Sequence, residues 1–332
     1  MMNRKIVIGT RASKLALWQA EWVKSELERL HPGIVVELNK IKTTGDKIVD
    51  VPLAKVGGKG LFVKEIEEAM LRGEADIAVH SMKDVPTEFP QGLHLAVICK
   101  REDPRDAFIT RRGNPAGRPD IRSSAIPNFA SLPQCAVIGT SSLRRSCQLL
   151  HARPDLKIEQ LRGNLDTRLR KLDEGLFDAI ILAAAGVKRL GWSDRITEIL
   201  STETSLPAIG QGAIGIECRM EDDINDLIAP LNDRDTSVCV VAERAFLKKL
   251  EGGCQVPIAA YARLQSDMLI MEGLVGNLAG DLIIKDSTEG KASDAESLGI
   301  RLAESLLARG AKNILDEVYG KCAPKINGDI AS

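Results

Sequence analysis

Two segments place hydroxyl and guanidinium groups directly after a short apolar run. Residues 10–13 (Thr-Arg-Ala-Ser) follow the run at 6–9, and residues 140–145 (Thr-Ser-Ser-Leu-Arg-Arg) follow the run at 136–139. If a helix starts at each point, its free backbone N–H groups and positive dipole end can bind an anion. Helix capping with solvated arginines is the alternative for either segment alone. Because the arrangement occurs twice, the sequence favours a ligand with several negative groups between two units.

Further basic residues stand where apolar runs end. Lys83 follows residues 78–82, Arg189 follows 179–187, and Arg162 follows 158–161, with Arg168 one to two turns later. Solvated surface charge is the alternative for any one of them. Their shared placement favours a polyanion made of carboxylates or phosphates. The Gly-Gly-Lys-Gly loop at 57–60 could join this site as a flap, but it lacks the spacing of a nucleotide P-loop.

Two single residues could carry chemistry. Asp84 places one carboxylate beside Lys83, although its position alone favours a turn residue before Pro86 over a catalytic group. Cys254 lies in the segment Glu-Gly-Gly-Cys-Gln-Val-Pro, which describes an ordered loop, whereas Cys239 sits in an apolar run as structural thiols usually do. Without a visible base, Cys254 alone does not establish a nucleophile.

Strands and helices in two similar units must position these residues. The strand at 5–10 and the strand at 135–140 both end in Ile-Gly-Thr, and each precedes apolar residues at helical spacing. A second repeat joins residues 71–78 to residues 173–180, where a helix stops at Gly and an Asp precedes a new strand. This alternation predicts two α/β units with parallel sheets and ligands at the carboxyl ends of the strands.

The final third of the chain has a different pattern. A helix is expected around 238–246, followed by three strands at about 257–264, 268–276 and 282–288. Ser293 and Glu296 have the spacing of a capping box that opens a last long helix. We therefore predict a small α+β third domain.

Composition restricts the class of protein. The chain has 332 residues, 45 basic and 46 acidic side chains, and a net charge of −1, with 44% hydrophobic and 27% charged residues. These values indicate a globular protein of two or three domains and disfavour nonspecific binding to nucleic acid or membrane surfaces. Seven cysteines without a Cys-x-x-Cys pair and only four histidines predict reduced thiols and no metal site. With neither a membrane span nor a secretory signal visible, a cytoplasmic location is expected.

Seven ordered motifs resemble the porphobilinogen deaminase (hydroxymethylbilane synthase) family over essentially the full length. They lie at residues 8–13, 57–62, 80–86, 139–145, 161–164, 210–213 and 251–257. The main departure is the loop at about 111–131, which looks longer than is usual for the family and touches none of the motifs. The resemblance implies two periplasmic-binding-protein-like (type II) α/β domains plus a small α+β domain. Domain 1 would comprise 1–105 and 212–230, domain 2 106–211, and domain 3 231–332.

The resemblance also implies an activity. The family is expected to condense four porphobilinogen molecules head to tail, with loss of ammonia, and to release hydroxymethylbilane in tetrapyrrole (porphyrin and haem) biosynthesis. It implies a dipyrromethane cofactor bound to Cys254 through a thioether, a monomer, and transfer of the product to uroporphyrinogen III synthase. A noncatalytic solute receptor or regulator is the competing class, because duplicated α/β lobes with an anion cleft also serve those functions.

Roles carried over by this resemblance follow the motifs. Asp84 would be the catalytic carboxylate, and Lys83 and the arginines should favour its ionised form. The residues implied to hold the cofactor are Cys254, Ser81, Lys83, Thr140, Ser142, Arg144, Arg145, Arg168 and Arg189. Those implied to bind substrate are Arg11, Ser13, Lys55, Lys59, Arg162 and Gln211. Each pyrrole ring brings two carboxylates, so the family's ligand is the polyanion that the basic residues predict.

Overall fold

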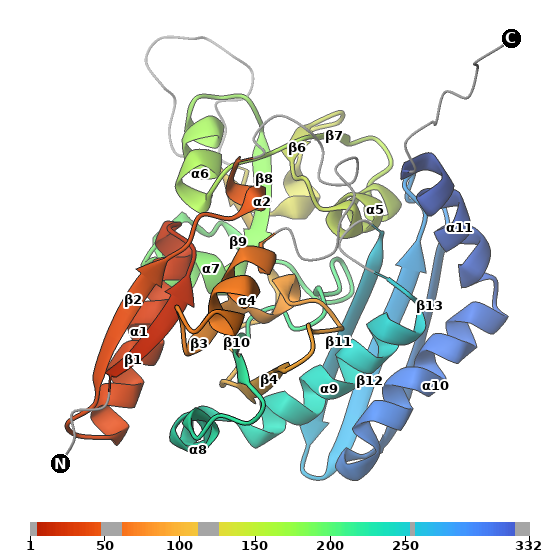
Figure 1. Ribbon diagram of the computed structural model, residues 1–332. Helices are drawn as coiled ribbons and strands as arrows, with labels where there is room; N and C mark the ends of the chain where they lie inside the picture. Colours follow the sequence, from red (N-terminus) through yellow and green to blue (C-terminus); the bar gives the residue numbers. More distant parts are fainter. Residues whose placement is uncertain (1–4, 48–61, 112–125, 253–255, 323–332) are drawn as a thin grey trace, which may run out of the picture.

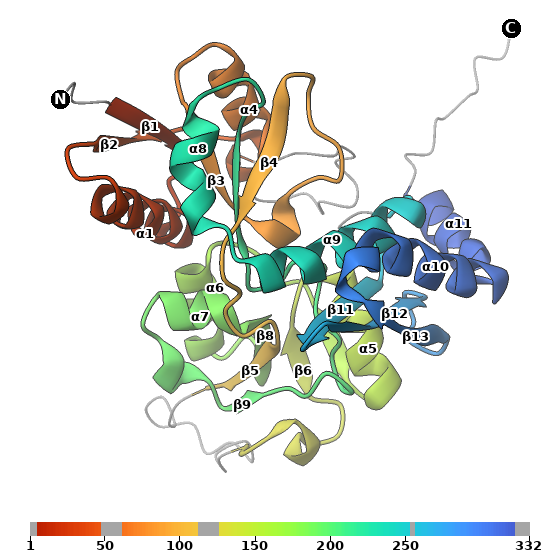
Figure 2. The ribbon, with the colours of Figure 1, turned by 90° about the horizontal axis from the view of Figure 1, so that it is seen from below.

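The structure is a computed structural model that describes residues 5–47, 62–111, 126–252 and 256–322. Figures 1 and 2 show two α/β lobes with a third domain packed beside them. Within the described residues, no helix combines the length and apolar character needed to cross a membrane.

The first lobe is built on a five-stranded sheet in the order β2-β1-β3-β10-β4. β1, β2 and β3 run parallel, whereas β10 is antiparallel to both β3 and β4. Its elements are β1 (Lys5–Thr10), α1 (Lys14–Leu30), β2 (Val35–Lys40), α2 (Thr44–Lys47), α4 (Lys64–Leu71), β3 (Ile77–Ser81), η1 (Met82–Asp84), β4 (Leu93–Ile98), β10 (Ile214–Arg219), α8 (Ile224–Ile228) and η4 (Ala229–Leu231). The apolar stripe of α1 buries Ala20, Val23 and Leu27 against this sheet, as the sequence spacing predicts.

The second lobe repeats the plan with the order β7-β6-β8-β5-β9. Here β5 is the antiparallel strand next to β8. Its elements are β5 (Asp106–Thr110), η2 (Phe129–Ser131), β6 (Val137–Gly139), α5 (Leu143–Ala152), β7 (Lys157–Glu159), α6 (Leu165–Asp173), β8 (Ala179–Ala183), α7 (Ala184–Arg189), η3 (Ser193–Arg195) and β9 (Glu198–Ile199). The expected pair of type II α/β lobes is confirmed, but each sheet is mixed rather than parallel, because a strand distant in sequence inserts in the opposite direction.

The third domain is an antiparallel sheet covered by helices (Figure 2). Its elements are α9 (Arg234–Lys249), β11 (Ile258–Gln265), β12 (Met268–Gly276), β13 (Ile283–Lys291), η5 (Ala292–Asp294), α10 (Ala295–Ala308) and α11 (Ala311–Cys322). The three predicted strands are therefore present. The predicted capping box is not, because Asp294 occupies the N-cap of α10 without a side-chain cap bond and Ser293 donates to Asp294 instead. The helix that starts there is followed by α11, so it is not the last.

Two crossing segments join the lobes and lie side by side. The N–H of Cys99 donates to the carbonyl of Ile214, and the N–H of Glu102 donates to that of Gly212. Gly212 has φ +95°, and a Cβ there would lie 2.3 Å from the Glu102 carbonyl oxygen. Only glycine fits this close approach of two backbones.

Glu243 on α9 attaches the third domain to these crossings. Its fully buried carboxylate accepts hydrogen bonds from the Arg101 guanidinium at 2.6 and 3.1 Å, and from the N–H groups of Gly210 at 2.7 Å and Ala262 at 2.9 Å. One side chain thus joins both crossings to β11. Such a charge is tolerated in the interior because it is paired and fully hydrogen-bonded.

We predict that Glu243→Leu lowers the free energy of unfolding by about 3–5 kcal/mol, because it leaves the Arg101 charge buried without its partner. Urea unfolding followed by tryptophan fluorescence measures this loss. The control is Glu174→Ala, whose pair with Arg170 is exposed and should contribute only about 0.3–0.5 kcal/mol. Equal losses in the two variants would contradict the role assigned to Glu243.

Candidate active site

Asp84 lies where the central strand of the first lobe ends. β3 runs into the short helix η1, whose last residue is Asp84, and the Asp84 side chain is exposed. It lines a cavity together with Arg11, Ser13, Gln19, His80 and Ser81. The carboxyl end of β3 therefore brings Asp84 next to the first of the two predicted anion-binding segments.

The opposite wall of this cavity comes from α1 and the residues before it. The Ser13 hydroxyl accepts the N–H of Ala16 and so caps α1, which is the alternative considered for this segment. The buried Gln19 amide donates to the Ser81 hydroxyl at 2.9 Å. The Arg11 guanidinium lies 4.3 Å from the centre of the Phe62 ring, a cation–π contact that orients the cation.

Positive charge accumulates behind Asp84. Burial lowers the pKa of Lys83. The nearby Asp84 raises this pKa, whereas Arg145 and Arg168 lower it further. Burial likewise lowers the pKa of Arg168 to about 10, and repulsion from Arg145 adds to it. These cations come from η1, α5 and α6, so the sheet topology collects them from segments far apart in sequence. The site therefore has an electrostatic preference for an anion.

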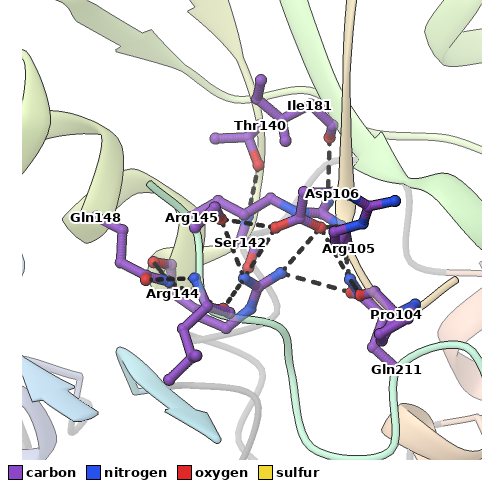
Figure 3. A network of polar contacts seen from close by, with 12 residues as sticks. Pro104, Arg105, Asp106, Thr140, Ser142, Arg144, Arg145, Gln148, Ile181 and Gln211 are labelled. Carbon is purple, nitrogen blue, oxygen red and sulfur yellow. Dashed lines mark hydrogen bonds and ion pairs between the residues drawn. The ribbon is translucent and has the colours of Figure 1, made fainter. Parts of the chain in front are cut away.

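A buried network centred on Asp106 supports this group (Figure 3). Arg144 pairs with one side of the carboxylate at 2.9 Å and Arg145 with the other at 2.7 Å. Ser205 donates to it at 2.7 Å and Gln211 at 3.0 Å. The two arginines hold the pKa of Asp106 well below its usual range, despite burial. The resulting stability is present above the ordinary pKa of an aspartate and is lost as the pH falls.

Three of the predicted ligand residues belong to this network. Arg144, Arg145 and Gln211 are all buried and contact Asp106. Arg144 also donates to the carbonyl of Leu206 at 2.6 Å, and Arg145 to that of Ile181 at 3.0 Å. Their guanidinium groups satisfy a buried carboxylate that lies 38 and 39 residues earlier in the chain. Sequence spacing gives no signal for such a partner.

The structure distributes the remaining predicted residues around the same region. Thr140 is buried and accepts the N–H of Ser142, which is the N-cap of α5. Arg162 follows β7, as expected. Arg189 instead ends helix α7, where it donates to the Gly212 carbonyl at 2.7 Å and lies over the Trp18 ring. Lys55, Lys59 and Cys254 lie outside the described residues.

Sequence reasoning missed three side chains of the site. Gln19 reads as part of the helical stripe, Phe62 as an apolar residue, and His80 as a strand residue. His80 and Gln19 could have been found as polar residues at positions where the surrounding pattern predicts burial. Both are buried in the structure. Asp106 carried the same signal at the start of β5.

Comparison with known proteins decides the family. A family model described as "Porphobilinogen deaminase, dipyromethane cofactor binding domain" matches residues 6–226, and one described as "Porphobilinogen deaminase, C-terminal domain" matches residues 237–308. The chain belongs to the porphobilinogen deaminase family. The family resemblance inferred from the motifs is therefore confirmed.

Curated relatives agree with this assignment. The chain is 58% identical over 320 residues to a porphobilinogen deaminase of Trichlorobacter lovleyi, covering 96% of this chain and 98% of the relative. It is 59% identical over 320 residues to a porphobilinogen deaminase of Geobacter metallireducens, covering 96% of each. Among solved structures, a probable amino-acid ABC transporter extracellular-binding protein of Bacillus subtilis is 12% identical, with a TM-score of 0.40, over 69% of this chain and 90% of that one.

The network predicts different outcomes for two arginines of this deaminase. Arg144→Leu should lower the free energy of unfolding by about 3–5 kcal/mol, because it removes one partner of a buried ion pair. Arg168→Leu should change it by about 1 kcal/mol, because Arg145 and Arg162 repel Arg168 while Asp84 attracts it, and the variant loses one hydrogen bond to the carbonyl of Gly163. Urea unfolding of both variants tests this contrast. An Arg144→Leu protein that is as stable as the parent but lacks the cofactor would contradict this structural role and support a ligand-binding role for Arg144.

Proposed function

We propose that the cavity beside Asp84 is the active site of this deaminase and that Asp84 is its catalytic carboxylate. As a porphobilinogen deaminase, the chain is a transferase that condenses four porphobilinogen molecules head to tail with loss of ammonia and yields hydroxymethylbilane for tetrapyrrole biosynthesis. The observation that carries the site assignment is one exposed carboxylate placed among partly buried cations at the end of β3.

The charge of the site fits the dipyrromethane cofactor of the family. Lys83 lies close enough to Arg145 and Arg168 for both to act on its pKa, and Asp84 and Asp106 oppose them. Asp106 is itself shared with Arg144, so an excess of positive charge remains. A group that carries four carboxylates would compensate this excess, and planar guanidinium forks suit carboxylates. When bound, the cofactor supplies the free pyrrole carbon that starts the chain.

We assign the binding roles according to position. Lys83 and Arg168 would hold the cofactor carboxylates, and Arg11 with Arg162 those of the incoming substrate. Arg145 would act through its positive field, because its donors already contact Asp106 and Ile181. Thr140 and Ser142 would present the start of α5 to the same ligand. Cys254, which lies outside the described residues, remains our proposal for the covalent attachment point.

Asp84 is suited to electrostatic catalysis rather than to proton donation. The aminomethyl group of porphobilinogen is an ammonium at neutral pH, so ammonia can leave without an added proton. Its departure leaves a cation delocalised over the pyrrole ring. A carboxylate about 4 Å from that cation contributes on the order of 4 kcal/mol at an effective dielectric near 20. This corresponds to roughly a thousandfold in rate.

Three further assignments rest on the family and the sequence. We propose a cytoplasmic monomer that delivers its product to uroporphyrinogen III synthase, in keeping with the five free cysteines among the described residues. We propose domain boundaries at 1–105 with 212–230, 106–211 and 231–332, which follow the sheet membership of the strands. A noncatalytic receptor is the less favoured alternative, because both matching family models describe a deaminase.

We predict that the purified protein has an intact mass higher than its sequence by one dipyrromethane unit and that peptide mapping finds the adduct on the Cys254 peptide alone. Cys254→Ser should fold but lack the adduct, because a thiol in a glycine-rich loop contributes little to the core. Cys239→Ala is the matched control, since Cys239 is buried in α9 and burial raises the pKa of its thiol to about 12. An adduct on the Cys239 peptide would refute the assignment.

We predict that Asp84→Asn lowers turnover by at least about 100-fold, because it keeps the shape of the side chain and removes its charge. Asp84→Glu keeps the charge with altered reach and should retain more activity than Asp84→Asn. Glu88→Gln, which removes an exposed carboxylate four residues later, should have little effect. Steady-state assays on protein with verified adduct content measure these rates. Equal activity of the Asn and Glu variants would exclude the electrostatic role.

A further inference from the structure

Three titratable side chains that the proposed mechanism does not use meet beneath the Asp84 cavity. Glu67 comes from α4, His80 from β3 and Glu217 from β10. In the antiparallel pairing, His80 is opposite Gly215 and Glu217 is opposite Ala78, so both side chains lie on the sheet face that α4 covers. The exposed fraction is 6% for Glu67, 6% for His80 and 0% for Glu217.

The polar atoms of this cluster lack ordinary hydrogen-bond partners. His80 Nε2 lies 3.2 Å from Glu217 Oε2. Neither of these atoms, nor Glu217 Oε1 or Glu67 Oε1, has a hydrogen bond in the structure. Buried carboxylate oxygens in this situation cost free energy unless a proton or a cation compensates them. The cluster therefore needs a compensating charge.

The charged groups around the cluster supply only part of that charge. They are Glu67 and Glu68 on α4, His80 on β3, Glu217 on β10 and Arg244 on α9, whose positive charge interacts with Glu217. The exposed Glu68 is compensated by solvent and by Lys64. Among the described residues, two buried carboxylates then face one permanent cation, so this part of the interior is neutral only when one additional proton is bound. Burial, and secondarily Glu217, raises the pKa of Glu67 to about 7, which places this proton in the neutral range.

We propose that Glu67, His80 and Glu217 form a proton-binding site that accepts the proton released by each pyrrole condensation. His80 is the member that exchanges the proton, because it alone of the three lines the cavity with Asp84 and Arg11. Glu217 and Glu67 are positioning residues, because Glu217 lies 3.2 Å from His80 Nε2 and the two carboxylates can share the charge of a bound proton. This proposal rests on the proposed function of the Asp84 cavity.

The reaction requires such an acceptor. When two pyrroles join, a C–C bond forms between the α-carbon of one ring and the aminomethyl carbon of porphobilinogen. The C–N bond breaks and ammonia leaves with its electron pair. The C–H electrons of the α-carbon return to the ring, and the proton passes to His80. The cluster then returns this proton to ammonia or solvent, so each addition yields one ammonium ion and the cluster is restored.

Separate groups for the two tasks avoid a conflict. If Asp84 accepted the proton, it would lose the negative charge that stabilises the pyrrole cation in the next addition. Asp84 is exposed among cations, whereas the cluster is buried and shares its charge between two carboxylates. Different environments of this kind allow one group to remain ionised while another exchanges protons.

NMR on the holoenzyme tests the proton site directly. The chain has four histidines, at 31, 80, 94 and 151, so His80→Gln identifies the ring signals of His80. We expect the ring nitrogen signals of His80 to differ between the parent protein and Glu217→Gln, because that change removes the carboxylate that lies 3.2 Å from His80 Nε2. The His151 signals serve as the internal control, since His151 lies in α5 and contacts Gly280. Identical His80 ring signals in the parent protein and in Glu217→Gln would overturn the proposal.

Stability against pH provides a second readout without turnover. The pKa of Glu67 is higher in the folded protein than its ordinary value of 4.5, so its proton stabilises the fold at low pH and this contribution is lost as the pH rises from about 4.5 to 7. Glu67→Gln should remove this component of the pH dependence. An unchanged profile in Glu67→Gln would show that no proton is held there and would contradict the proposal.

Kinetics with porphobilinogen deuterated at its free α-carbon test the acceptor role. His80→Gln should lower turnover about 100-fold with little change in KM, and its rate should become sensitive to deuterium. Asp84→Asn should lose activity without that sensitivity, and His31→Gln, remote from the cavity, should match the parent. Parental turnover of His80→Gln with full adduct would overturn the acceptor role. Failure of the wild-type protein to consume porphobilinogen would instead refute the proposed function, so the two failures are distinguishable.

Discussion

The buried carboxylate of Asp106 is the interaction on which the arrangement of the site depends. It lies at the start of β5, directly after the first crossing segment, and it receives Gln211 from the second crossing. Without Arg144 and Arg145 this charge could not be buried, and without Asp106 two adjacent guanidinium groups could not share the interior. Each partner therefore requires the other, and together they fix both crossings against α5.

This structural role has an electrostatic consequence for the ligand. Two arginines share one carboxylate, so the network as a whole keeps about one positive charge. Arg145 acts on Lys83 and on Arg168, lowering the pKa of each. We propose that the positive field of these arginines also attracts the polyanion. In a partly buried cleft such a field is screened less by salt than a surface charge would be.

Helix α9 connects the third domain to the first lobe through charged side chains. Glu243 binds Arg101 of the first crossing, and the next residue, Arg244, donates to the carbonyls of Val85 and Pro86 at 3.2 and 2.7 Å. Helix α9, which precedes Cys254 in the chain, therefore contacts the turn that follows Asp84. Two adjacent residues of α9 therefore connect the third domain to the first crossing and to the turn that follows Asp84.

The parts of the fold that sequence predicts are those determined by local pattern. The 3.6-residue stripe of α1, the alternating strands β11 to β13 and the motif that ends in Asp84 all depend on neighbours within a few residues. The insertion of β10 into the first sheet could not be read this way, because its partner β3 lies more than 130 residues earlier. Arg144 shows the same limit at the site. The sequence around an arginine at a helix start is the same whether its guanidinium contacts a ligand or a distant carboxylate such as Asp106. The capping-box prediction for Ser293 is wrong for a local reason, because Ser293 lies inside a turn of 3₁₀ helix and Asp294 takes the N-cap position.

Placing one negative group among so many positive ones makes chemical sense once the carboxylates of the ligand are considered. Each pyrrole brings two carboxylates that would occupy the cations, and this pairing would leave Asp84 as the charge facing the ring. Asp84 then interacts with the pyrrole at the moment when it becomes cationic, which is the condition for stabilising a transition state more than a ground state. The cations around Asp84 would therefore serve two purposes, since they bind the polyanion and, once the polyanion occupies them, leave Asp84 to face the pyrrole. A site with fewer cations would bind the chain more weakly and would also leave its carboxylates to repel Asp84.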